Sequence, residues 1–249
     1  MRTLLGIVVL LILTPICGSI VLLASVLGVD DRSGSVFDRM PHWWARAITW
    51  AAGVHVIVHG DEHRRGARHV FVANHVSWFD VLVMAASLRW FKFVAKAELQ
   101  RIPLFGRAAA AAGTVYIQRE NRKAAFDAYR EAAEKIGEGA SVIVFAEGTR
   151  GDTYALRPFK KGPFVLAIRA QAPIVPTVIH GTIAVQPRGR LRVDAGPVHV
   201  HFLEPVLTAG LGYEQRDRLA AAVRDRMAAC LEREYGVKSE VILPRRSPA

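Results

Sequence analysis

Cysteine is scarce in this sequence of 249 residues, which contains only Cys17 and Cys230. Cys17 lies in a long apolar run and Cys230 in a segment with helical periodicity, so the two side chains have different expected surroundings. We therefore predict no disulfide bond between them. A chain without disulfides is compatible with a domain that faces the cytoplasm, where thiols are kept reduced.

Several familiar sequence patterns are also missing. No serine or cysteine stands in a Gly-x-Ser-x-Gly turn, which argues against a nucleophilic triad of the hydrolase type. The sequence has no recognisable nucleic-acid-binding motif, internal repeat or linker-like stretch. Because the apolar runs are spread evenly, we expect one globular domain with an N-terminal appendage.

Acidic residues are outnumbered by basic ones, 22 to 33, which gives a formal net charge of +11. This excess favours a partner rich in phosphate, either nucleic acid or anionic membrane lipid. Residues 4–29 carry no charged side chain, and about 20 such residues are enough to cross a bilayer as a helix. We therefore expect residues 1–29 to form a membrane anchor helix, with anionic lipid rather than nucleic acid as the partner.

The apolar run has two other interpretations, a cleaved signal peptide and a buried core helix. Its flanking charges are too balanced to assign an orientation by the positive-inside rule. Residues 30–53 include three tryptophans near basic residues, which is typical of an amphipathic helix at the headgroup level, although such aromatics also pack on cores. We assign residues 54–240 to the globular domain and residues 241–249 to a flexible tail.

Short runs of apolar and β-branched residues predict six strands. Helix-length stretches separate several of them, which is typical of an α/β fold with a mixed, largely parallel sheet flanked by helices. Helices are expected over residues 121–137, with Asn121 as the N-cap, and over residues 213–235. Residues 191–202 alternate around a Gly-Pro pair, which fits a late hairpin or a pair of edge strands. The predicted strands are residues 54–58, 70–73, 91–95, 114–118, 142–145 and 174–179.

The most informative polar segment follows the predicted strand at residues 70–73, where four residues separate His75 from Asp80. An imidazole at a strand end can reach a substrate while a carboxylate binds its other ring nitrogen. A helix that begins near Ser77 or Trp78 would fold Asp80 back toward His75. The pair would then act as a general base and its orienting partner, whereas a structural histidine bound to a helix-capping aspartate would have the same spacing.

Polar residues also follow two further predicted strands. A glycine permits a tight loop, and a threonine hydroxyl and a forked arginine can bind a phosphate, while a glutamate would neutralise or orient one of the cations. Ligands gather outside the carboxyl ends of parallel strands, so we expect these groups to share a pocket with His75; ordinary surface ion pairs are the alternative. The residues are Arg119, after the strand at 114–118, and Glu147, Gly148, Thr149 and Arg150, after the strand at 142–145.

Four sequence blocks stand in order within residues 50–210. They are Asn74, His75 and Asp80; Gly113, Tyr116, Ile117 and Arg119; Phe145, Glu147, Gly148, Thr149 and Arg150; and Ile174, Val175 and Pro176. With these blocks the sequence resembles the PlsC-type glycerolipid acyltransferases, most closely the bacterial 1-acyl-sn-glycerol-3-phosphate acyltransferases. Two segments that begin at Lys96 and Phe159 add lesser similarity. Gly151 and Thr177 depart from the usual pattern, which bears on substrate preference more than on activity.

The resemblance implies that His75 is the general base and that Asp80 orients it, with direct attack by the acceptor hydroxyl and no acyl-enzyme. It implies an acyl-CoA or acyl carrier protein donor, no cofactor, and lysophosphatidic acid as the acceptor that becomes phosphatidic acid. An acceptor that is another lysophospholipid or a lyso-aminolipid is the alternative, as is a non-catalytic lipid-binding protein of the membrane surface. The expected location is the cell inner membrane, with the catalytic domain facing the cytoplasm. Substrate-binding roles are implied for Arg119, Glu147, Gly148, Thr149, Arg150, Lys96 and Lys160.

The histidines away from the His75 segment raise the question of a metal site. His55 and His59 share a face of one predicted strand, and His199 and His201 share a face of another segment. Since no acidic or cysteine partner stands at ligand spacing, we expect solvated or core histidines and no metal. The histidines considered are His55, His59, His63, His69, His180, His199 and His201.

Overall fold

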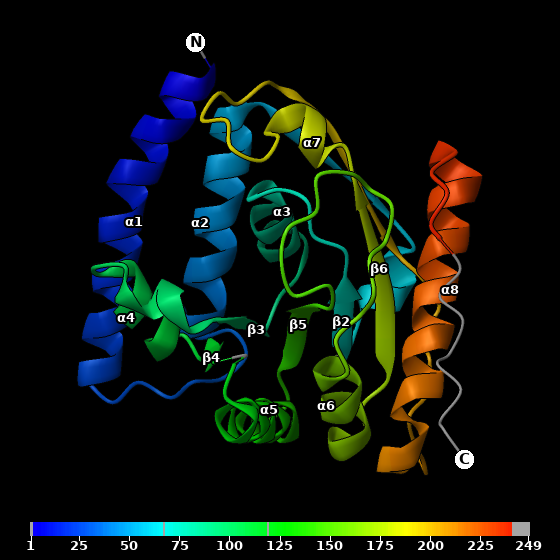
Figure 1. Cartoon of the computed structure of the whole chain (residues 1–249). Coiled ribbons are helices and arrows are strands. Elements are labelled where there is room, and N and C mark those ends of the chain that lie inside the picture. Colours follow the sequence, from blue (N-terminus) through cyan, green and yellow to red (C-terminus); the bar gives the residue numbers. More distant parts are fainter. Residues whose placement is uncertain (1, 67, 119, 241–249) are drawn as a thin grey trace.

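The computed structural model describes residues 2–66, 68–118 and 120–240. Strands and helices alternate along the chain (Figure 1), as the sequence predicts. The helices are α1 (Arg2–Val26), α2 (Val36–Ala52), α3 (Phe79–Ser87), α4 (Phe105–Ala111), α5 (Arg122–Gly137), α6 (Gly162–Ala170), α7 (Thr182–Val185) and α8 (Arg216–Tyr235), with 3-10 turns at Asp61–Arg64, Ala97–Arg101 and Tyr213–Gln215. The strands are β1 (Val54–His59), β2 (Val70–Ala73), β3 (Phe91–Lys96), β4 (Val115–Ile117), β5 (Ser141–Phe145), β6 (Ile174–His180) and β7 (Gly196–Phe202).

The strands form one seven-stranded sheet in the order β1-β7-β6-β2-β5-β3-β4. β6 and β7 run antiparallel, whereas the other described pairs are parallel. The prediction of an α/β fold with a mixed, largely parallel sheet is confirmed. Strands β2 to β6 all point the same way, so their C-terminal ends line one edge of the sheet, called here the carboxyl edge.

The predicted hairpin or edge pair over residues 191–202 is wrong. β7 is one strand, and it lies inside the sheet between β1 and β6. Its first residues, Gly196 and Pro197, pair with Val54 and His55 of β1. Proline is tolerated at the beginning of a strand, so the Gly-Pro pair marks where the strand begins and does not interrupt it.

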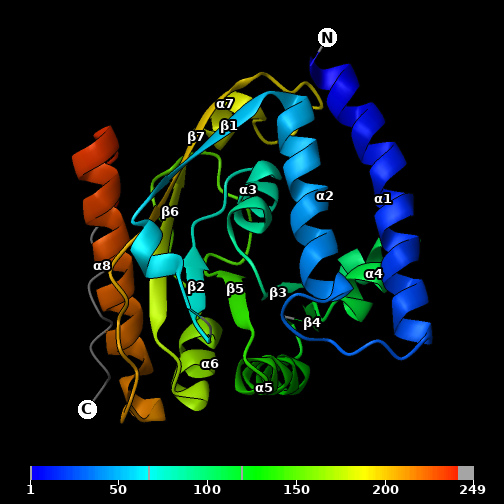
Figure 2. The ribbon, with the colours of Figure 1, turned by 180° about the vertical axis from the view of Figure 1, so that it is seen from behind.

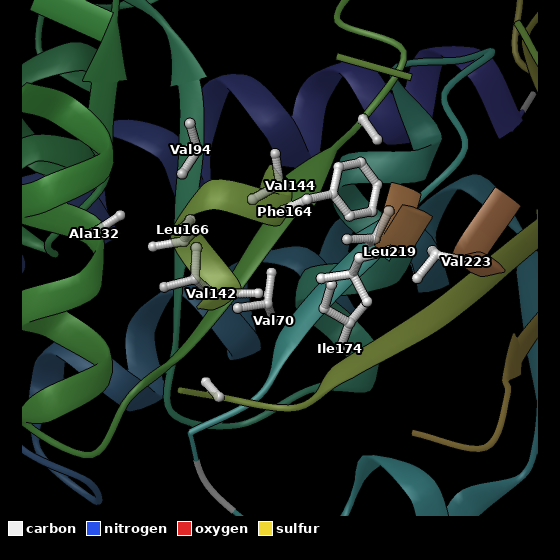
Figure 3. Close-up of a cluster of buried hydrophobic side chains, with 14 of the residues drawn as sticks. Val70, Val94, Ala132, Val142, Val144, Phe164, Leu166, Ile174, Leu219 and Val223 are labelled. Atoms are coloured by element: carbon white, nitrogen blue, oxygen red, sulfur yellow. The ribbon is translucent and has the colours of Figure 1, made fainter. Parts of the chain in front are cut away.

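Helices cover both faces of the sheet. Phe71 and Ile143 contribute to a core under α2 and α3, whereas Val70 and Val142 enter a second core under α5, α6 and α8 (Figure 3). Successive residues of β2 and β5 therefore face two buried layers, and both strands are buried along their whole length. A strand buried on both faces needs an unbroken apolar run, which is why these two strands are plain in the sequence.

The N-terminal helix α1 is by length and composition able to cross a membrane. It packs beside α2 and α4 (Figure 2) around a small cluster that contains Val21, Phe37 and Ala108, while most of its residues stay exposed. Its first turn is fastened at two points: the Thr3 hydroxyl donates to the carbonyl of Val193 (2.9 Å), and the Val193 N–H donates to Oγ1 of Thr3 (3.1 Å). The beginning of α1 is thus attached to the connection between α7 and β7.

The tryptophans of α2 divide between the two roles considered for them. Trp44 turns inward, and its indole N–H donates to Thr14 of α1 (3.1 Å). Trp43 and Trp50 remain 57% and 72% exposed, which suits rings at the headgroup level of a bilayer. The interfacial role of residues 30–53 stays a prediction that rests on these two side chains.

The predicted helix ends are confirmed. Asn121 caps α5, since its side-chain oxygen accepts hydrogen bonds from the N–H groups of Lys123 and Ala124, both at 3.1 Å. The helix expected over residues 213–235 is a 3-10 turn that continues into α8. The tail predicted at residues 241–249 lies outside the described residues.

Candidate active site

The first polar group at the carboxyl edge follows β2. Asn74 links the end of β2 to β6 through two hydrogen bonds with Ile179. The Asn74 side-chain NH₂ donates to the Ile179 carbonyl (2.9 Å), and the Ile179 N–H donates to the Asn74 side-chain oxygen (2.8 Å). The amide thus replaces a pair of backbone ladder bonds and fixes the strand end. The chain then turns and α3 begins at Phe79, so that Asp80 stands in the first helical turn and points back toward the end of β2.

His75 and Asp80 meet as the sequence predicts. Nδ1 of His75 lies 2.8 Å from Oδ2 of Asp80, and the ring stacks on Phe145 with centroids 4.1 Å apart. The His75 side chain is 15% exposed, whereas that of Asp80 is fully buried. A neutral imidazole that donates from Nδ1 carries its lone pair on Nε2, and no described residue hydrogen-bonds to this atom. Nε2 is therefore open to accept a proton from a bound molecule.

The Asp80 carboxylate is surrounded by donors. Oδ2 accepts the backbone N–H groups of Val76 (2.6 Å) and Ser77 (2.7 Å) in addition to His75, and Oδ1 accepts the hydroxyl of Thr182 (2.6 Å). Hydrogen bonds to a carboxylate are shorter and stronger than neutral ones. Four donors from two segments of the chain, residues 75–77 and Thr182, therefore hold this buried charge in one orientation.

Thr182 is a site residue that sequence reasoning missed. It is fully buried at the beginning of α7. Its position is set by Tyr154, whose hydroxyl oxygen accepts the N–H groups of Gly181 and Ile183, each at 2.8 Å. Thr182 lies 102 residues beyond Asp80 and belongs to no recognised block, so only the fold reveals the contact.

Glu147 braces the loop that carries His75. Oε1 accepts the His75 backbone N–H (3.1 Å), while Oε2 accepts the N–H (3.3 Å) and Nε–H (3.1 Å) of Arg157. The Gly151 N–H also donates to the His75 carbonyl (2.8 Å). Glu147 is 6% exposed, and Gly148, at φ +81°, allows the sharp turn after it. The prediction that Glu147 pairs with a neighbouring cation is confirmed, with Arg157 as that cation.

Arg150 and Thr149 lie on the same loop. The guanidinium of Arg150 stands 4.7 Å from the ring centre of Trp78, which is 47% exposed between His75 and α3. The carbonyl of Thr149, an exposed residue, accepts a hydrogen bond from the guanidinium of Arg157. Arg150 is thus held beside the His75 loop by a ring instead of by a carboxylate, which leaves its charge available to an anion.

The remaining residues predicted to bind substrate are Lys96, Lys160 and Arg119. Lys96 ends β3 and forms an exposed ion pair with Glu98 (2.7 Å). Lys160 stands on the rim of a cavity of about 440 Å³ between α5 and α6, which reaches Phe145 and Gly148. Its lining includes buried apolar side chains of β3, β4, β5 and α6, with further exposed cations on the rim at Lys161, Arg130 and Arg169. Arg119, predicted to bind phosphate, lies outside the described residues.

Comparison with known proteins identifies the family to which the chain belongs. The model of the family described as "Acyltransferase" matches residues 55–180. The chain belongs to this acyltransferase family. The matched region holds β1 to β6 and the entire His75 loop, so the geometry described above is that of a family member.

Relatives in this acyltransferase family carry a common description. The chain is 33% identical over 179 residues to a protein of Cocos nucifera and 32% identical over 188 residues to one of Saccharomyces cerevisiae, both described as 1-acyl-sn-glycerol-3-phosphate acyltransferase. The matches cover 71% and 72% of this chain but 57% and 61% of those proteins, so the chain spans less than two thirds of their length.

A solved acyltransferase has the same fold. The crystal structure of the 1-acyl-sn-glycerophosphate (LPA) acyltransferase PlsC from Thermotoga maritima superposes with a TM-score of 0.76 at 27% sequence identity. The match covers 96% of this chain and 100% of that one. The similarity therefore includes the N-terminal helices as well as the sheet.

Proposed function

We propose that this chain is a 1-acyl-sn-glycerol-3-phosphate acyltransferase, which moves a fatty acyl group from an acyl thioester to the sn-2 hydroxyl of lysophosphatidic acid and forms phosphatidic acid. The observation that carries the proposal is the geometry of the His75 loop: Nδ1 is engaged by the buried Asp80, and Nε2 has no hydrogen-bond partner among the described residues. The descriptions of the relatives support the choice of reaction.

In the proposed mechanism His75 is the general base and Asp80 its orienting partner. The acceptor hydroxyl oxygen bonds to the thioester carbonyl carbon while its proton moves to Nε2 of His75. Asp80 stabilises the imidazolium that forms. The tetrahedral intermediate then breaks its C–S bond, and the departing sulfur takes the proton from Nε2. Each step uses one imidazole, so no acyl-enzyme is needed.

The acceptor's phosphate would be bound by cations near the His75 loop. Arg150 is the first candidate, because the Trp78 ring positions its guanidinium without neutralising it. Lys160 is a further candidate, and Lys96 would first have to give up its contact with Glu98. Arg119 remains a candidate on its sequence position alone. Gly148 and Thr149 would shape the loop that receives the substrate. Glu147 contributes through the backbone of His75, because both its oxygens are occupied by protein donors.

The acceptor and the product are lipids, so the proposed site belongs at a membrane surface. The exposed apolar residues of α1 and the exposed Trp43 and Trp50 of α2 suit that position. The formal charge of +11 favours an anionic lipid surface. We propose the inner membrane of the cell as the location, with the sheet domain on the cytoplasmic side, where acyl-CoA and acyl carrier protein would be available as donors.

Acyl transfer by the purified, detergent-solubilised protein tests the proposal. Wild type and the His75→Ala variant are compared with acyl-CoA and acyl carrier protein donors, on lysophosphatidic acid and on lysophospholipids with other headgroups. We expect phosphatidic acid from wild type and a loss of about 10² to 10⁴ in turnover for His75→Ala. The matched control is His55→Ala, which changes an exposed histidine of β1 and should retain full activity.

The outcomes separate the alternatives. Transfer to another headgroup alone would keep the mechanism and change the acceptor to a different lysophospholipid or a lyso-aminolipid. Near-wild-type activity of His75→Ala would remove His75 as the base. If wild type transfers no acyl group from any donor to any acceptor, the chain is a lipid-binding protein of the membrane surface and the enzymatic proposal fails.

A further inference from the structure

Three histidines meet on the sheet away from the His75 loop. β1 and β7 pair in parallel, with His59 opposite His201 and Ile57 opposite His199. His199 and His201 are two residues apart and share a face of β7, so His59 approaches both of them. One ring nitrogen from each of the three histidines lies within 4.8 Å of the others.

The spacing of these nitrogens is close to that of a metal coordination shell. Nε2 of His59 lies 3.0 Å from Nδ1 of His199, and the His59 and His201 rings stack with centroids 4.1 Å apart. Zn–N bonds of about 2.0–2.1 Å in a tetrahedron place two ligand nitrogens about 3.3 Å apart. The hydrogen-bonded His59–His199 pair is therefore close to ligand separation, and the widest spacing has to close by up to about 1.5 Å. One ring of the stacked His59–His201 pair also has to turn, because the lone pair of an imidazole lies in the plane of its ring.

His201, the most buried of the three histidines, is held in place by a residue outside the group. His201 is 6% exposed, and its Nε2 lies 2.6 Å from the hydroxyl of Tyr235 at the end of α8. Metal-bound imidazoles commonly use their second nitrogen for such a hydrogen bond, which fixes the ring and its tautomer. If Nε2–H of His201 donates to Tyr235, the lone pair on Nδ1 is free for a cation.

We propose that His59, His199 and His201 bind a divalent transition-metal ion of the Zn²⁺ type, with water completing its shell. Three neutral nitrogens without a carboxylate suit zinc, nickel or copper, whereas magnesium and calcium require oxygen ligands. The sequence argument expected no metal because it searched for acidic or cysteine partners along the chain. The third ligand instead arrives from a strand about 140 residues away, through the parallel pairing of β1 with β7.

The role of this ion is structural. β1 ends at the side of the sheet opposite the carboxyl edge, because β7, with which it is parallel, runs antiparallel to β6. An ion at His59 would join the outermost strand to its neighbour and, through His201 and Tyr235, to α8.

A metal titration of the full chain tests this proposal independently of acyl transfer. The protein is prepared in detergent without a histidine tag, treated with a chelator, and titrated with Co²⁺ followed by visible absorption, then with Zn²⁺ in competition. The variants are His59→Gln and His199→Gln, which alter the two less buried ligands. The controls are His55→Gln, on the same strand and face as His59, and His75→Gln, which removes the histidine of the proposed active site.

We expect wild type and both controls to bind one ion per chain, and His59→Gln and His199→Gln to bind at least about 10-fold more weakly. Zn²⁺ should raise the melting temperature of wild type and of His55→Gln, but not of His59→Gln. Circular dichroism verifies that each variant is folded. No binding by folded wild type, or equal binding by wild type and both ligand variants, would overturn the proposal. Loss of binding in His75→Gln alone would place the ion at the carboxyl edge and overturn it as well.

Discussion

Thr182→Val tests how much of the His75 geometry depends on a residue outside the sequence blocks. Valine has nearly the shape of threonine, so the change removes one hydroxyl and leaves the packing of α7 intact. The lost bond joins the Thr182 hydroxyl to Oδ1 of Asp80 at 2.6 Å, in a place where both residues are fully buried. The same substitution at Thr208 is a matched control, because Thr208 is 1% exposed and donates to the Ala172 carbonyl (2.8 Å) away from the carboxyl edge.

The expected effect of Thr182→Val on stability follows from the type of hydrogen bond that is lost. A hydrogen bond to a charged group contributes about 1.5–3 kcal/mol, against about 1 kcal/mol for a neutral one, so Thr182→Val should destabilise the protein more than Thr208→Val. Three donors to Asp80 remain and limit its displacement. Since a displacement of about 1 Å can cost about 100-fold in rate, we expect a fall of about 10-fold in kcat with KM nearly unchanged.

The assay is steady-state acyl transfer at saturating donor, with thermal unfolding of each variant measured in the same detergent. Thr182→Ser, which restores the hydroxyl, should recover most of the lost kcat. The reasoning is refuted if Thr182→Val keeps the wild-type kcat, or if Thr208→Val lowers kcat to the same degree. A decrease confined to KM would also contradict it, because Thr182 is assigned to positioning Asp80 and not to binding substrate.

Three further predictions concern the loops and the buried charges. Glu147→Gln should lower kcat about 10-fold in steady-state assays, because the amide cannot accept hydrogen bonds at both positions. Gly181→Ala should lower the melting temperature more than Gly189→Ala: both glycines have positive φ, 103° and 82°, but a Cβ clashes with backbone only at Gly181. Burial lowers the pKa of Lys92, which pairs with Asp31 at 2.7 Å. The Lys92 amine therefore binds its proton more tightly in the unfolded chain than in the folded protein, so the free energy of unfolding should rise with pH towards about 10. Asp31→Asn removes the partner that raises the pKa of Lys92, so the rise should be steeper in this variant. Thermal unfolding at about pH 7.5 and 9.5 measures both effects.

The parts of the fold that could be predicted are those coded locally. The strands at Val70–Ala73 and Ser141–Phe145 are buried on both faces, so their composition alone marks them. The His75–Asp80 contact is local as well, because a turn and the first residues of α3 bring the carboxylate back within hydrogen-bond reach. The loop with Glu147 could be expected at the same edge, since it follows a neighbouring parallel strand.

The rest depends on strand order, which short patterns do not encode. Thr182 reaches Asp80 because β6 lies beside β2, and no motif carries that adjacency. The placement of β7 between β1 and β6 turned an expected edge pair into an interior strand. It also brought His59 to His199 and His201, which are separate from it in sequence and have no recognisable ligand spacing.

The two hydrogen bonds between Thr3 and Val193 fix the beginning of α1 against the rest of the protein. Val193 and Thr182 both belong to the connection between β6 and β7, so the beginning of the apolar helix α1 is tied to the same segment that supports Asp80. If α1 is a membrane anchor, as proposed, its position in the bilayer is therefore coupled to the segment that supports Asp80. In that arrangement α1 would set the distance between the lipid layer and His75 as well as hold the protein at the membrane.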